Sequence, residues 1–224
     1  MNGEEKLMLW RKKEQYYLWY TAYLPLFLIM VYRFIDGLNL FGNVMLIKYI
    51  INTLTKYGTD FIVVVCIILF SYVMYRIVIR WLLNKEINNL INGRRGNSFS
   101  IRSTEKLSAN DYTFFLMSLL LPLFSLDYES FINLIISFLI IVVVVYIYVK
   151  TDFISVCPLF YTTGFQVYKA ILSEYPKEKE QEDPSVRIKA IIITKSKNPD
   201  LDDDYRGIRL ISNIYLVIKI EKAS

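Results

Sequence analysis

The most constraining feature of this chain is a run of nineteen residues, Phe131–Val149, without a charged side chain. A second long run, Phe61–Leu83, is interrupted by charge only at Arg76 and Arg80. A helix needs roughly 20 predominantly apolar residues to cross the hydrocarbon core of a bilayer. Lipid offers the backbone no hydrogen bonds, so such segments fold as helices. The chain is therefore expected to be an integral membrane protein.

Two weaker apolar segments complete the expected set of spans. In the first expected span along the chain, residues 16–31, tyrosine and tryptophan gather at the start, which is typical of the aromatic belt at a membrane interface. The third contains Pro122, and the few residues between it and the fourth predict a tight antiparallel hairpin. Residues 1–150 are thus predicted to form a domain of four transmembrane helices. The expected spans are 16–31, 61–83, 107–126 and 131–149.

The segment 38–57, between the first two spans, carries an apolar stripe at helical spacing. It predicts an amphipathic helix lying on the outer leaflet. A fifth span is the alternative, and it would place the Arg94–Arg95 loop outside and divide the cytoplasmic cations. The stripe comprises Leu40, Val44, Ile47, Ile51 and Leu54.

The distribution of charge gives the orientation. Residues 1–150 hold 15 Lys and Arg against 10 Asp and Glu, whereas residues 151–224 hold 11 of each. The cations flank the first span and fill the segment between the second and third. Because positively charged loops stay on the cytoplasmic side, both termini are expected in the cytoplasm. The excess of positive charge is thus attributed to the membrane half, and no direct binding of nucleic acid is expected.

The last 74 residues differ in kind, since apolar and polar residues alternate there with a period of two. The predicted strands are 165–172, 186–195 and 214–220. Residues 151–224 are therefore predicted to be a small cytoplasmic β module. The expected fold class is an α-helical integral membrane protein with four transmembrane helices plus a small C-terminal antiparallel β module.

No residues suggest catalysis. The chain has no histidine, which removes His ligands and His bases, and its two cysteines cannot form a metal site alone. The acidic run Asp202–Asp204 lacks the glycine and terminal glutamate of a calcium loop and is interpreted as a solvated turn. We expect a protein that is not an enzyme, with no catalytic, cofactor or metal site.

Two pairs of arginines are the candidate functional residues. Arg76 and Arg80 lie four apart and share one helix face. They either snorkel to lipid phosphates or line a subunit interface or pore. Arg94 and Arg95 lie in a cytoplasmic loop, where they could dock an acidic partner or act only as a positive-inside topology signal.

One stretch of the chain resembles a known family. After the fourth span the sequence reads Asp152 to Phe160 as DFISVCPLF, and Gly164 to Lys169 as GFQVYK. Together with four spans and a short β tail, this resembles KwaA, the membrane subunit of the Kiwa anti-phage defence system of bacteria.

The resemblance implies a bacterial inner-membrane protein that assembles as a homo-oligomer, with a tetramer suspected. It also implies a cytoplasmic effector protein, KwaB-like, as partner, and detection of infection at the envelope, for which the outer stripe of segment 38–57 is the candidate sensing element. The function expected is thus a non-enzymatic sensor that recruits or regulates an effector. The alternatives are a small oligomeric ion channel or pore-forming effector, and a plain membrane scaffold.

Overall fold

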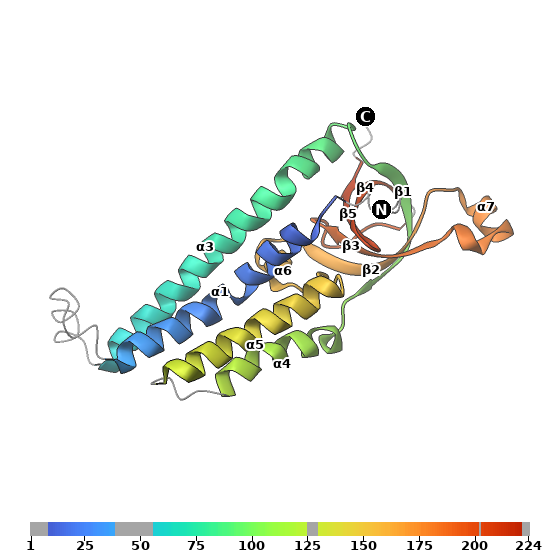
Figure 1. Cartoon of the computed structure of the whole chain (residues 1–224). Helices are drawn as coiled ribbons and strands as arrows, with labels where there is room; N and C mark the ends of the chain where they lie inside the picture. The colour runs from blue at the N-terminus through green and yellow to red at the C-terminus, as the bar shows by residue number, and fades with distance from the viewer. Residues whose placement is uncertain (1–8, 39–55, 125–129, 202, 221–224) are drawn as a thin grey trace.

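A computed structural model describes residues 9–38, 56–124, 130–201 and 203–220. Long helices run side by side, and a small β-barrel closes one end of them (Figure 1). The stripe Leu40, Val44, Ile47, Ile51 and Leu54 lies outside the described residues.

Three helices are long and apolar enough to cross a membrane: α1 (Lys12–Gly37), α3 (Lys56–Ile91) and α5 (Phe131–Lys150). They match the first, second and fourth predicted spans and are compatible with a membrane protein. The remaining helix, α4 (Ala109–Phe124), has 16 residues. At a rise of 1.5 Å per residue it is about 24 Å long, against about 30 Å for the hydrocarbon core. A fourth span over 107–126 therefore stays a prediction.

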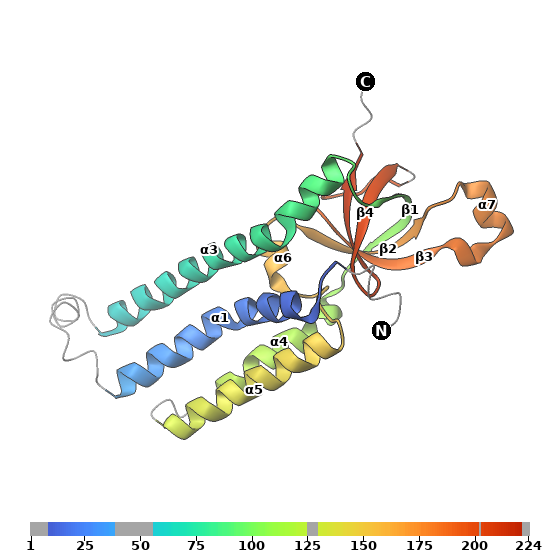
Figure 2. The same ribbon diagram turned by 45° about the horizontal axis from the view of Figure 1, so that its top comes forward.

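The helices alternate in direction. α1 leads away from the barrel, α3 returns to it, α4 leads away and α5 returns (Figures 1 and 2). Both ends of the described chain consequently lie at the barrel end of the helices, which agrees with termini on one side.

Ion pairs lie at both ends of the apolar part of the long helices. At the far end, Arg33 pairs with Asp60 at 3.5 Å, and Phe34 contacts the ring of Phe131. At the barrel end, Lys12 pairs with Asp152 at 2.7 Å. Lys12 and Arg33 are both on α1 and are separated by about 32 Å of helix. The charged levels are therefore about one hydrocarbon thickness apart.

Within this layer α1 is the central helix, packed against α3 on one side and α5 on the other (Figure 2). Trp19 of α1 stacks on Tyr148 of α5, with ring centroids 4.2 Å apart. Hydroxyl groups join the helices: Ser118 of α4 lies 2.6 Å from the Tyr23 hydroxyl and 2.8 Å from that of Tyr148. A serine in an apolar helix is thereby satisfied through hydrogen bonds to its neighbours.

The β module is a closed five-stranded barrel with the strand order β1-β2-β3-β5-β4. The pairs are antiparallel except β3–β5, which is parallel. The prediction of an antiparallel module is therefore wrong for this pair, and the sheet is mixed. The strands are β1 (Asn97–Lys106), β2 (Gln166–Ser173), β3 (Ile188–Thr194), β4 (Asp204–Ile211) and β5 (Ile214–Lys219).

β1 is the second difference from the sequence analysis. It comes from the segment between α3 and α4, so the barrel is not made from residues 151–224 alone. Its alternate residues Phe99 and Ile101 enter the barrel core beside Leu172 of β2 and Tyr205 of β4. Pairing with β2 and β4 places the strand between two partners far away in the sequence.

A charged excursion between β2 and β3 carries the short helix α7 (Lys177–Glu182) and points away from the long helices (Figures 1 and 2). Its anchor is Glu180, which is only 2% exposed. Arg102 of β1 approaches the carboxylate at 2.6 Å and Arg187 at 3.1 Å. Burial raises the pKa of Glu180, but hydrogen bonds from Arg102, Ser173 and Arg187 outweigh it and hold the pKa below its usual value.

Candidate functional site

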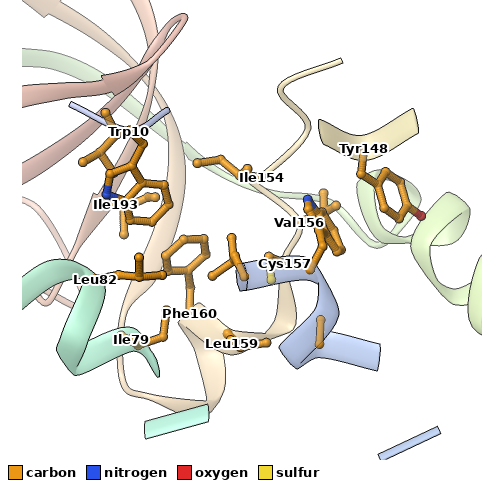
Figure 3. Packing of buried hydrophobic residues seen from close by; sticks show 14 of the residues in the cluster. Trp10, Ile79, Leu82, Tyr148, Ile154, Val156, Cys157, Leu159, Phe160 and Ile193 are labelled. Atoms are coloured by element: carbon orange, nitrogen blue, oxygen red, sulfur yellow. The ribbon is translucent and has the colours of Figure 1, made fainter. Parts of the chain in front are cut away.

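The segment that follows α5 forms a junction between the long helices and the barrel, which we define as residues 151–165. It contains the short helix α6 (Pro158–Thr162). Phe160 is fully buried against Ile79 and Leu82 of α3, and Trp10 stacks on it with ring centroids 6.5 Å apart (Figure 3). The buried residues of the junction are Ile154, Ser155, Val156, Cys157, Leu159, Phe160 and Phe165.

The residues that carry the family resemblance have structural roles here. Cys157 is the extended residue before α6, and Pro158 occupies the first helical position, where no backbone N–H is needed. Gly164 ends α6 with a φ of 86°, a conformation that favours glycine. The N–H of Phe165 then donates to the carbonyl of Phe160 at 2.9 Å. The motif thus turns the chain from the helices into β2.

The thiol of Cys157 is part of this packing. The residue is fully buried, and burial raises its pKa to about 12. The thiol is therefore neutral at physiological pH, and it is not activated as a nucleophile.

The chain before α1 also contacts the barrel. The backbone N–H of Leu9 donates to the carbonyl of Arg209 at 3.3 Å, and that of Trp10 to the carbonyl of Leu210 at 3.0 Å. Both carbonyls belong to β4, beyond the part of that strand that pairs with β1. The start of α1 is thereby fixed to the barrel.

One hydrophobic core crosses the junction without interruption. It contains Leu18 of α1, Leu83 of α3 and Val145 of α5, and also Val167 and Ile214 of the barrel. The packing of the long helices and of this side of the barrel is therefore shared. The barrel interior has a second core of its own.

The predicted docking residues Arg94 and Arg95 lie in the turn from α3 to β1, and both are exposed. Arg95 is 3.7 Å from Glu86 of α3, whereas Arg94 forms no ion pair with any described residue. The turn itself is fixed, because Gly96 has a φ of 95° and a Cβ there would lie 2.8 Å from the carbonyl oxygen of Gly207. Arg94 is thus exposed on a turn whose backbone lies close to β4 at Gly96.

The other predicted pair, Arg76 and Arg80, lies on an exposed part of α3 beside the junction. Both residues line a cavity of about 240 Å³ together with Lys195, which follows β3. The sequence pattern places the two arginines on one helix face but gives no signal that Lys195 joins them.

The described residues do not assemble a catalytic or metal site. No group of three or more Cys, Asp or Glu residues in the described ranges is placed to hold a metal ion. In the acidic turn, Asp200 and Asp203 lie 2.6 and 2.7 Å from the ammonium of Lys219. Lys219 donates hydrogen bonds to both carboxylates, and these raise the pKa of Lys219. The ammonium thus offsets part of the negative charge of this turn.

These features define a class of protein: apolar helices compatible with a membrane, joined through one core to a small β-barrel. The chain belongs to the KwaA family, because the family model of anti-phage protein KwaA matches residues 14–216. That range covers all described helices and strands apart from the first residues of α1 and the last of β5. The predicted resemblance is confirmed, and with it a role in anti-phage defence. No curated protein and no solved structure matches the chain.

Proposed function

We propose that this protein is a non-enzymatic sensor of the bacterial inner membrane that detects infection at the envelope and recruits or regulates a cytoplasmic effector, KwaB-like. In this proposal α4 is a fourth span, and the barrel and both termini lie in the cytoplasm. The observation that carries the proposal is the single core that joins α1, α3 and α5 to the barrel.

That core supports a mechanical route for the signal. A perturbation of the bilayer that tilts or separates the helices moves the junction, since Phe160 is packed between α3 and Trp10. The barrel moves with it, because Leu9 and Trp10 are hydrogen-bonded to β4. A change at the envelope thus alters the surface that faces the cytoplasm.

The outward turn at Arg94 is the proposed contact for an acidic patch on the effector. Arg94 is exposed and forms no ion pair with a described residue, so its charge is accessible to an acidic surface. We expect Arg94→Glu to weaken recruitment of the effector by about tenfold or more, because a favourable contact becomes a repulsive one.

Co-purification of the effector from membranes tests this docking. Lys106→Glu is the matched control, because Lys106 is also exposed and also lies at an end of β1. The outcome that contradicts docking is equal recruitment by the Arg94→Glu protein, the Lys106→Glu protein and the unmodified protein. Survival of cells after phage infection, measured with the same variants, tests whether recruitment matters for defence.

A homo-oligomer is proposed from the exposure of α3. Only 17% of its most apolar window is buried, against 33% for α1 and 28% for α5. Since α3 packs against α1 along one side, its remaining apolar surface is available to lipid and to another copy. A mass of four times 26.5 kDa for the detergent-extracted protein, corrected for detergent, supports the tetramer. Conductance of the purified protein in planar bilayers would instead favour a channel.

A further inference from the structure

The cavity beside the junction is lined by cations from two distant parts of the chain. Arg76 and Arg80 contribute from α3, and Lys195 contributes from the turn after β3. Asn84 and Thr163 also line it, and none of its lining residues is a carboxylate. The cavity therefore combines three positive charges with neutral hydrogen-bonding groups.

These three cations form no ion pair with a described carboxylate, although several other cations of the fold do. In the described ranges, Lys12, Arg33, Arg95, Arg102, Lys169, Arg187 and Lys219 all lie within 4.0 Å of a carboxylate. Within the same ranges no carboxylate pairs with Arg76, Arg80 or Lys195. Arg76 lies 5.5 Å from the ring centroid of Tyr72, and Lys195 lies 5.6 Å from that of Phe165. The cavity therefore gathers three positive charges without a described carboxylate to offset them.

The cavity also lies at a defined height along the helices. Asp60 and Phe131 mark the far charged level, as described above. On α3, Arg80 lies about 29 Å along the helix from Phe61. On α5, Lys150 lies about 29 Å along the helix from Phe131. Arg80 and Lys150 are therefore at the same height above the far charged level. In a bilayer of ordinary thickness this is where lipid phosphates lie.

Exposed apolar residues of α3 lie next to the cavity arginines in the sequence, since Ile77 follows Arg76 and Trp81 follows Arg80. Val73 and Ile77 are 52% and 54% exposed, and Trp81 is 65% exposed with its ring against Tyr17. Tryptophan at this height is typical of a membrane interface. The arrangement offers cations to a headgroup and an apolar surface to its acyl chains.

We propose that this cavity binds a phosphate group, with Arg76, Arg80 and Lys195 sharing its charge, and that an anionic phospholipid headgroup supplies it. Arginine suits phosphate because its planar fork donates two parallel hydrogen bonds. Since the cations come from both α3 and the barrel, a bound headgroup ties the barrel to α3 at the membrane surface. The inference rests on the proposed membrane location.

Native mass spectrometry of the purified full-length protein in detergent tests the proposal. Phosphatidylglycerol, phosphatidylcholine and inorganic phosphate are titrated separately. We expect phosphatidylglycerol to bind and the double variant Arg80→Gln/Lys195→Gln to bind it about 30-fold more weakly, at about 1 kcal/mol for each lost cation. The single variant Lys195→Gln is expected to lose about fivefold on the same basis. It also provides the test if the double variant does not fold.

Lys189→Gln is the matched control, because Lys189 lies at the other end of β3, is exposed and does not line this cavity. Equal binding of phosphatidylglycerol by all variants overturns the proposal, and so does equal binding of phosphatidylcholine. If inorganic phosphate binds with the same dependence on Lys195 and displaces the lipid, the phosphate site stands and the lipid source is overturned. Protection against phage is scored separately, so its loss leaves the lipid result unchanged.

Discussion

The helices and the barrel bury their apolar residues in opposite ways. In the barrel, Phe99, Ile192 and Val217 point inward and are at most 4% exposed. In α3, Phe61 is 70% exposed and Leu69 is 59% exposed, while the hydroxyl-bearing Ser71 is 2% exposed. A water-soluble surface does not carry so much apolar area. The comparison teaches that the helices have a surface compatible with lipid and the barrel a surface suited to water, and that the junction lies between them.

The junction itself gives the largest expected effect. Phe160→Ala removes a fully buried ring and should destabilise the protein by about 4 kcal/mol. The control is Phe70→Ala on the exposed side of α3, where detergent or lipid fills the space, with a loss of about 0.5 kcal/mol or less. Equilibrium unfolding in mixed micelles, followed by tryptophan fluorescence, measures both. Similar losses would show that Phe160 is not packed as described.

A charge placed on either surface tests the two solvents directly. Leu69→Lys, in the middle of α3, should cost about 3 kcal/mol of membrane insertion. Leu201→Lys, at a barrel turn and 54% exposed, should change stability by about 0.5 kcal/mol or less. Membrane fractionation and a glycosylation-site insertion assay report the difference. Normal insertion of the Leu69→Lys protein would falsify the placement of α3 in lipid.

A smaller effect is expected from the hydroxyl cluster between the helices. Ser118→Ala removes the hydrogen bonds to Tyr23 and Tyr148 and should destabilise the bundle by about 1 kcal/mol, the range found for hydrogen bonds between membrane helices. Unfolding in micelles measures it, with Ser130→Ala as the control because the Ser130 side chain forms no helix cap. An unchanged unfolding free energy for Ser118→Ala would contradict the cluster.

The smallest expected effect near neutral pH is the contribution of Glu180 to the stability of the barrel. The pKa of Glu180 is lower in the folded protein than its usual value of 4.5, so the unfolded chain binds the proton first as pH falls. Stability from Glu180 is fully present above about pH 5.5 and declines as pH falls through 4.5 toward the folded pKa. Unfolding measured against pH checks this. Glu180→Gln should flatten that decline, whereas Glu178→Gln on the exposed side of α7 should keep it.

Local sequence patterns predicted the helices and strands in which apolar residues recur at regular spacing. The uncharged run Phe131–Val149 became α5, and the alternation near Ile192 and Leu216 became β3 and β5. The family was also recognisable, because the turn through Pro158 and Gly164 requires particular residues. These signals all come from neighbours in the sequence.

Sequence reasoning missed two strands, β1 and β4. β4 pairs with β5 nearby in the sequence, but residues 204–211 were not among the predicted strands. β1 depends on partners far away. β1 has only Phe99 and Ile101 as inward apolar residues and is otherwise polar, so its sequence is typical of a loop. The parallel pair β3–β5 arises because β4 pairs with β5 and β1, which leaves β5 beside β3. The sequence of β3 or of β5 alone does not indicate that these two strands pair. The same applies to Lys195, which meets Arg76 and Arg80 only through the closed fold.

The insertion of β1 between two helices has a consequence for biosynthesis. The ribosome completes β1 about 60 residues before it begins β2, and at about 5–20 residues per second this takes about 3 to 12 s. Throughout that interval the strand has neither of its partners, β2 and β4. Nascent chains stalled within α4 or α5 would display an unpaired edge to chaperones and proteases. Closure of the barrel is thus a late step that only complete polypeptides can take.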